Sequence, residues 1–92
     1  MIKNFDEFIT EKKQPIRTFR FVDKKGNDLS DINNEYSNIN PDTVDLKKFA
    51  NDIFRNYANC YSVLVQEFNY ANDEAVEKFE ISRTKPDEII EL

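Results

Sequence analysis

Residues 60–70 read CYSVLVQEFNY and form the most strand-like segment of the 92-residue chain. β-Branched and aromatic side chains dominate this segment, and Val63, Leu64 and Val65 follow one another with no polar residue between them. A continuous apolar run of this kind is typical of a strand that is covered on both faces. We therefore expect residues 60–70 to form a central strand of a sheet.

Two further strands are predicted from the segments around the central one. Residues 71–75 favour a turn, and residues 76–83 alternate so that Phe79 and Ile81 share one face. These residues should pair with the central strand as an antiparallel hairpin. Residues 16–22 also predict a strand, with Arg17, Phe19 and Phe21 on one face and Ile16, Thr18, Arg20 and Val22 on the other.

The main helix is predicted over about residues 42–59. Asn40 or Asp42 can cap this helix, and Pro41 suits its first turn. An apolar stripe at helical spacing follows, made of Leu46, Phe49, Ala50, Ile53, Phe54 and Tyr57. We expect the stripe to face the core.

The remaining segments predict shorter elements. A helix is expected over about residues 5–12, because Asn4 and Glu7 have the form of a capping box, and Pro15 ends it. Residues 29–40 are rich in Asn, Asp and Ser and predict a long loop with room for one helical turn. Residues 86–92 begin with a helix-start pattern, Pro-Asp-Glu, and predict a short terminal helix or a docking tail, with three aliphatic residues, Ile89, Ile90 and Leu92.

These elements together predict a small α+β sandwich in which residues 1–92 form a single domain. The expected order is helix-strand-helix-strand-strand, with the helices packed on a three-stranded, mostly antiparallel sheet.

The composition excludes several chemistries. The chain has no His, one Cys and one Gly, so it cannot build a His-based catalytic pair, a zinc site of Cys and His, or a Gly-rich phosphate loop. Carboxylates could in principle run acid–base chemistry or bind a cation, but the segment from Asp28 to Glu35 lacks the Gly and the bidentate Glu of a calcium loop. We expect no enzyme activity, no cofactor and no metal, and a buried Cys60.

The charge is unevenly distributed along the chain. Residues 1–25 carry seven Lys/Arg and four Asp/Glu, whereas residues 26–92 carry six and fourteen. Two stretches, 26–46 and 56–77, contain no basic residue. We take their carboxylates as the candidate partner-binding groups: Asp28, Asp31, Glu35, Asp42, Asp45, Asp73, Glu74 and Glu77.

Exposed carboxylates held on a rigid surface can imitate the phosphates of DNA, and electrostatic steering would speed their encounter with a basic site. The sequence as a whole resembles the anti-restriction nuclease (Arn) family of T-even bacteriophages. The resemblance rests on the opening residues Met1-Ile2-Lys3-Asn4-Phe5-Asp6-Glu7-Phe8, the length of 92 residues, the acidic pI and the absence of His and Trp. It also rests on an amino-acid usage that AT-rich codons would produce, with many Lys, Asn, Ile, Phe and Tyr residues. The basic segment 12–25 departs from a uniformly acidic mimic.

The resemblance implies a homodimeric DNA mimic that binds a host DNA-binding protein, the modified-cytosine-dependent restriction nuclease McrBC, and thereby protects phage DNA. No short motif carries residue roles across, so the eight carboxylates above remain candidates from the charge distribution. The resemblance implies no direct contact with nucleic acid.

Two other functions stay open. A structural or regulatory adaptor would dock through the apolar tail of residues 86–92. A nucleic-acid-binding module would use Arg17, Phe19 and Arg20, although these phenylalanines are expected in the core and net charge −5 opposes phosphate at long range. The chain has no long apolar run, and its first seven residues are too polar for a signal peptide, so we expect a cytoplasmic protein, in the host cytoplasm if viral, without a membrane partner.

Overall fold

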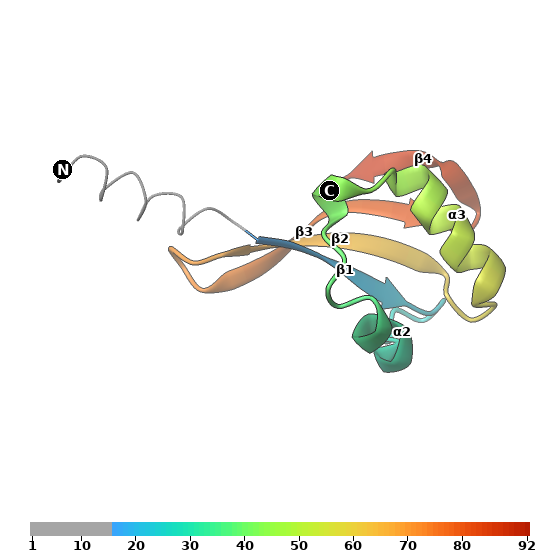
Figure 1. The fold of residues 1–92 in the computed structure, drawn as a ribbon, viewed down its shortest axis with the longest axis horizontal. Coiled ribbons are helices and arrows are strands. Elements are labelled where there is room, and N and C mark those ends of the chain that lie inside the picture. The colour runs from blue at the N-terminus through green and yellow to red at the C-terminus, as the bar shows by residue number, and fades with distance from the viewer. Residues whose placement is uncertain (1–15) are drawn as a thin grey trace, which may run out of the picture.

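The computed structural model describes residues 16–92 (Figure 1). Its elements in chain order are β1 (Ile16–Val22), α2 (Ser30–Glu35), the short 3-10 helix η1 (Pro41–Thr43), α3 (Leu46–Asn56), β2 (Ser62–Asn69), β3 (Glu74–Ser82) and β4 (Lys85–Glu91).

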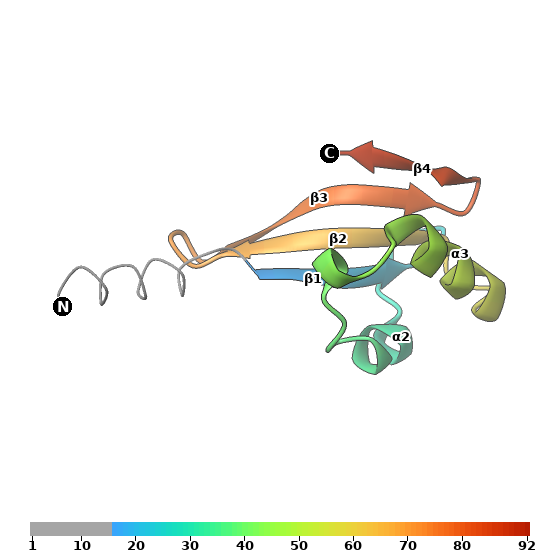
Figure 2. The same cartoon turned by 45° about the horizontal axis from the view of Figure 1, so that its top comes forward.

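The four strands form one antiparallel sheet in the order β1-β2-β3-β4, which Figure 2 shows most clearly. Strand β2 is an inner strand, as its apolar run predicts, with Val65 opposite Phe19 on β1 and opposite Phe79 on β3. The register between β2 and β3 shifts between Val65 and Gln66. Beyond this irregularity the β2–β3 hairpin extends past the helices (Figure 1).

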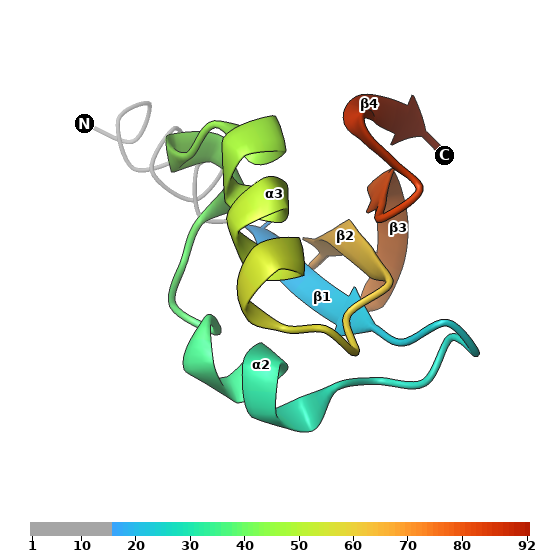
Figure 3. The same ribbon diagram turned by 90° about the vertical axis from the view of Figure 1, so that its right-hand side faces the viewer.

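Both α-helices lie on the same face of the sheet (Figure 3). The core between the two layers contains side chains from three strands and both α-helices: Phe19 and Phe21 from β1, Val63 and Val65 from β2, Ile81 from β3, and, from the helices, Ile32, Ala50, Ile53 and Phe54. Phe21, Ala50 and Cys60 are completely buried. The expectation that Phe19 and Phe21 are core residues is confirmed, and the predicted common face of Phe79 and Ile81 is the one that meets the core.

Local capping explains where η1 and α3 begin. The side chain of Asn40 accepts a hydrogen bond from the Asp42 backbone at 2.9 Å. The side chain of Asp45 caps α3 by accepting from the Lys48 backbone at 3.3 Å. The main helix therefore starts later than predicted, because η1 takes the segment that contains Pro41.

Helix α2, of six residues, lies within the segment that was predicted to be a loop with room for one helical turn. A side-chain hydrogen bond ties it to the sheet, since the Oδ1 atom of Asn33 accepts from the Phe21 backbone at 2.7 Å. Ile32 is buried in the core beside it. Leu29 and Tyr36, which flank the helix, also pack against the core, and the Leu29 backbone donates to the Phe21 carbonyl at 2.9 Å, so tertiary contacts hold this short helix against β1.

The predicted strand number and order are wrong. The sheet has four strands, and within residues 16–92 the order is strand, two short helical elements, helix, then three strands. The fourth is β4, where a terminal helix or free tail was expected. Ser82 pairs with Lys85 and Glu80 with Ile90, and the backbone of Leu92 donates to the Lys78 carbonyl at 2.9 Å.

The helix-start pattern at Pro86 is overridden because β3 otherwise presents an unpaired edge. Proline is tolerated in an edge strand, where its missing N–H need not join the ladder, and the β-branched Ile89 and Ile90 favour strand geometry. The helix predicted over residues 5–12 lies outside the described residues. In the part of the chain that the structure describes, no helix is long and apolar enough to cross a membrane.

Candidate functional site

Five of the predicted carboxylates lie on one segment that passes beside β1, and two of them, Asp28 and Asp42, contact that strand. We call the segment 28–45, with its carboxylates Asp28, Asp31, Glu35, Asp42 and Asp45, the acidic ridge. All five residues are exposed. The ridge runs antiparallel to β1, because Asp28 pairs with Val22 at the end of the strand and Asp42 contacts Arg17 near its start. Contacts of α2 and η1 with β1 hold the segment in place (Figure 3).

Arginines of β1 bind Asp28 at one end of the ridge and Asp42 near its other end. Arg17 donates from Nη1 to Asp42 at 3.3 Å and from Nε to Glu67 at 3.1 Å. Arg20 donates from Nε to Asp28 at 2.5 Å and from Nη1 to Glu77. The hydrogen bond with Asp28 is the largest cause that raises the Arg20 pKa. These contacts fix the carboxylates in position but neutralise part of their charge.

The middle of the ridge is held by tyrosines. The hydroxyl group of Tyr57 donates to Glu35 Oε2 at 2.7 Å and lies 3.4 Å from the hydroxyl group of Tyr36. The hydrogen bonds with Tyr36 and with Glu35 both raise the pKa of Tyr57. Because a neutral phenol donates this bond, Glu35 keeps its full negative charge while it is oriented.

The other three predicted carboxylates do not join the ridge. Asp73 and Glu74 lie at the tip of the β2–β3 hairpin, where Asp73 adopts a left-handed backbone conformation with φ of 56°. Glu77 lies on the helix-free side of the sheet, where Arg20 connects it to Asp28. The second base-free stretch is therefore a separate surface.

The three residues proposed for nucleic-acid binding, Arg17, Phe19 and Arg20, are engaged in contacts within the fold. Phe19 is 8% exposed and stacks on Phe49 with ring centroids 4.4 Å apart, so it has no face to offer a base. Arg17 and Arg20 are both paired with carboxylates. This arrangement agrees with the expectation that the phenylalanines are core residues and that the cations neutralise neighbouring acids.

The apolar tail of the adaptor alternative is part of the sheet. Ile90 is half-buried on β4, whereas Ile89 and Leu92 are 37% and 56% exposed. The backbone of the tail therefore forms its hydrogen bonds with β3, and two aliphatic side chains, Ile89 and Leu92, remain exposed.

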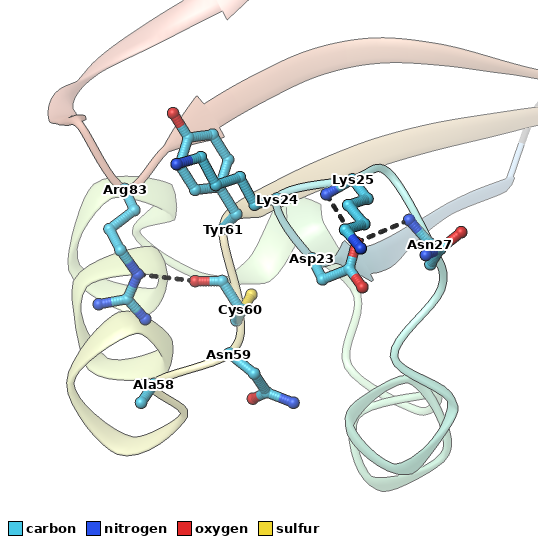
Figure 4. A pocket seen from close by; sticks show the side chains of 9 residues that line it. All are labelled: Asp23, Lys24, Lys25, Asn27, Ala58, Asn59, Cys60, Tyr61 and Arg83. Carbon is cyan, nitrogen blue, oxygen red and sulfur yellow. Dashed lines mark hydrogen bonds between the residues drawn. The ribbon is translucent and has the colours of Figure 1, made fainter.

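Sequence reasoning missed a basic pocket at the end of the sheet (Figure 4). Three loops far apart in sequence form it: the turn after β1, the α3–β2 connection and the β3–β4 turn. Its lining residues are Asp23, Lys24, Lys25, Asn27, Ala58, Asn59, Cys60, Tyr61 and Arg83. The Lys24-Lys25-Gly26-Asn27 turn pattern was visible, but nothing in the sequence indicated that Arg83 would lie beside it.

No group of three or more potential ligands within residues 16–92 is placed to hold a metal ion. Cys60 is completely buried, and burial raises the pKa of its thiol to about 11. A group that stays protonated near neutral pH is a poor nucleophile, so Cys60 serves packing. Comparison of the chain with protein-family models, curated proteins and solved structures finds no match.

Proposed function

We propose that this protein is a non-enzymatic inhibitor whose acidic ridge occupies the DNA-binding site of a restriction nuclease, the function that the family resemblance implies. The observation that supports the proposal is the ridge itself. Five exposed carboxylates lie on one segment packed against β1, and no Lys or Arg occurs between Gly26 and Leu46. The partner is a protein whose basic groups normally contact phosphates.

The spacing of carboxylates on the ridge is of the same order as the spacing of phosphates on a nucleic-acid strand, although Arg17 and Arg20 offset part of the charge of Asp42 and Asp28. A strand advances by about 3.3 Å per residue, so the ridge from Asp42, beside Arg17, to Asp28, beside Val22, extends on the order of 17 Å. Four carboxylates over that length give one per about 4 to 6 Å, compared with about 3.4 Å per phosphate on one DNA strand. The ridge is sparser than DNA, and a two-fold dimer would lengthen the row.

The fixed positions of the ridge carboxylates, as well as their number, favour binding to a basic site. Side chains that are already ordered lose less conformational entropy on binding. Arg17, Arg20 and Tyr57 each hold one ridge carboxylate through a hydrogen bond. The ridge therefore presents an arrangement that a basic site can meet without reorganising it.

A binding measurement with purified McrBC tests the proposal. The ridge variant carries Asp31→Asn, Glu35→Gln, Asp42→Asn and Asp45→Asn, changes that keep a hydrogen-bond acceptor at each position. We expect its affinity for the nuclease to fall about 10- to 1000-fold, because phosphate-like contacts dominate binding to such sites. Displacement of DNA from the nuclease should weaken in parallel.

The matched control removes the same charge away from the ridge, with Asp52→Asn, Asp87→Asn, Glu88→Gln and Glu91→Gln. All four residues are exposed, on α3 and β4. The control should bind within about threefold of the parent protein, since distant surface charges are largely screened at physiological salt. Equal losses in the two variants would show a net-charge effect and contradict the ridge, and absence of binding by the parent protein would contradict the proposed function.

A further inference from the structure

The pocket at the end of the sheet differs in charge from the rest of the molecule. Residues 16–92 carry ten Lys/Arg and fifteen Asp/Glu, yet the pocket is lined by three basic residues, Lys24, Lys25 and Arg83, and by one acidic residue, Asp23. None of the three basic side chains forms an ion pair within residues 16–92. No carboxylate of the described residues therefore neutralises these cations through an ion pair.

The turn that carries the two lysines is rigidly built. The Oδ1 atom of Asp23 accepts hydrogen bonds from the backbones of Lys25 and Asn27, both at 2.9 Å. Gly26 has a φ of 85°, a conformation that L side chains rarely adopt, and it lets the turn close. The single carboxylate of the pocket is thus engaged with its own backbone, and these bonds lower its pKa.

The opposite wall of the pocket is equally fixed. Arg83 donates from Nε to the Cys60 carbonyl at 2.8 Å and from Nη2 to the Tyr57 carbonyl at 2.7 Å, and its guanidinium lies over the ring of Phe54. These bonds leave Nη1 of Arg83 without a partner in residues 16–92. Figure 4 shows Arg83 and the lysine-bearing turn on opposite sides of the Cys60 segment.

Backbone hydrogen bonds join the three loops. The backbone of Tyr61 donates to the Val22 carbonyl at 2.9 Å, and the backbone of Arg83 donates to the Tyr61 carbonyl at 2.8 Å. The ladder of the sheet thus continues beneath the pocket. A ligand would meet a surface that is already assembled, which reduces the cost of binding.

We propose that this pocket binds the phosphate dianion of a small phosphorylated molecule. Two ammonium groups and a guanidinium suit a dianion with several acceptor oxygens. The cavity volume is about 430 Å³, which falls in the range of small-molecule sites. Tyr61, Asn27 and Asn59 add an aromatic ring and two amides, so there are groups to contact the organic part of a phosphate ester as well.

The negative net charge does not prevent this binding. The Debye length is about 8 Å at physiological ionic strength, so ligand affinity depends on the charges near the pocket more than on the net charge of the protein. The adjoining smaller pocket is lined by Asp28 and Asp31 and shares Asn59. Its acidic groups set an upper limit on affinity, and we expect millimolar to submillimolar dissociation constants.

Titration of ¹⁵N-labelled protein with AMP, inorganic phosphate and adenosine, followed by NMR, tests the site. AMP and phosphate should shift the amides of Asp23 to Asn27, Tyr61 and Arg83, and adenosine should shift them less. Tighter binding of AMP would identify an organic phosphate as the ligand, and equal binding would identify free phosphate; both results support a phosphate site. No shifts at ligand concentrations of about 10 mM, which would detect millimolar dissociation constants, would overturn the proposal, as would equal shifts with adenosine.

A pair of variants distinguishes phosphate binding at the pocket from non-specific attraction to surface lysines. Lys24→Ala with Lys25→Ala removes two pocket cations, and Lys47→Ala with Lys48→Ala removes an adjacent pair on α3 that does not line the pocket. All four lysines are exposed, so both variants should fold. We expect the pocket variant to bind phosphate and AMP about 10-fold or more weakly and the α3 variant to bind as the parent does. Equal weakening in the two variants would overturn the proposal, and nuclease binding should be unchanged in the pocket variant.

Discussion

On the helix-covered face of the sheet, Phe21 and Val63 are at most 1% exposed and pack against α2 and α3. On the opposite face, no helix of residues 16–92 covers the strands, and Arg20, Gln66 and Phe68 remain half-buried. Only the end of that face near Val22 and Leu64 is buried. The apolar burial that stabilises the sheet therefore lies mainly on the helix-covered face, and the opposite face can carry charged side chains.

The comparison explains how the acidic ridge is held. Arg17 projects from the helix-covered face and binds Asp42, whereas Arg20 projects from the open face and binds Asp28. The ridge thus crosses the edge of β1 from one face of the sheet to the other. Alternation along a single strand is what allows two arginines three residues apart to hold opposite ends of one segment.

The largest expected effect comes from removing an aromatic ring on each face. Phe21→Ala should lower the free energy of unfolding by about 3 to 5 kcal/mol, because it leaves a cavity in a core that cannot collapse easily. Phe68→Ala on the open face should cost about 1 kcal/mol, since the ring is half-buried and its aromatic neighbour is the exposed Tyr70, at a centroid distance of 5.0 Å. Chemical denaturation measures both, and equal losses would contradict the one-sided core.

A smaller effect is expected from the two arginines. Arg17→Met should cost about 1 to 2 kcal/mol, because it leaves Glu67 with one distant cation, Lys78. The side chain of Glu67 is 19% exposed, and Lys78 lies 3.9 Å from it. Arg20→Met should cost under about 1 kcal/mol, since surface ion pairs contribute little and its partners Asp28 and Glu77 are 58% and 38% exposed. A larger loss for Arg20 than for Arg17 in urea denaturation would show that the open face is more tightly coupled than its exposure indicates.

Much of the fold follows from local patterns, and the errors have a common physical cause. The faces of β1 and β3 and the apolar stripe of α3 depend on periodicity, and the inner position of β2 depends on its continuous apolar run; the chain carries both signals in its own sequence. Strand β4 and helix α2 depend on neighbours instead. Residues 86–92 become a strand because the edge of β3 is available, and residues 30–35 become a helix because Ile32 and Asn33 meet β1. Such tertiary contacts override local signals.

The candidate site could be predicted only in part for the same reason. The run of carboxylates from Asp28 to Asp45 stays together because it is contiguous and packs along one strand. Asp73 and Glu74 were grouped with it by charge alone, and the hairpin carries them elsewhere. The basic pocket combines residues 23–27, 58–61 and 83, and no one-dimensional pattern brings those three loops together.

The smallest expected effect is on the thiol of Cys60, which lies at the end of the covered face and should not react in the native protein. Burial raises its pKa to about 11 from the ordinary 9.0, so at pH 8 the thiolate fraction should fall about 100-fold, and the reagent must also reach a buried sulfur. Because the folded pKa is the higher one, the stability contributed by the protonated thiol is complete below about pH 9 and declines as the pH rises toward 11. A disulfide reagent should therefore modify denatured protein at once and native protein only as fast as it unfolds. Prompt modification of native protein at pH 8 would show that the end of the core beneath the pocket opens, and that the pocket is less rigid than its hydrogen bonds indicate.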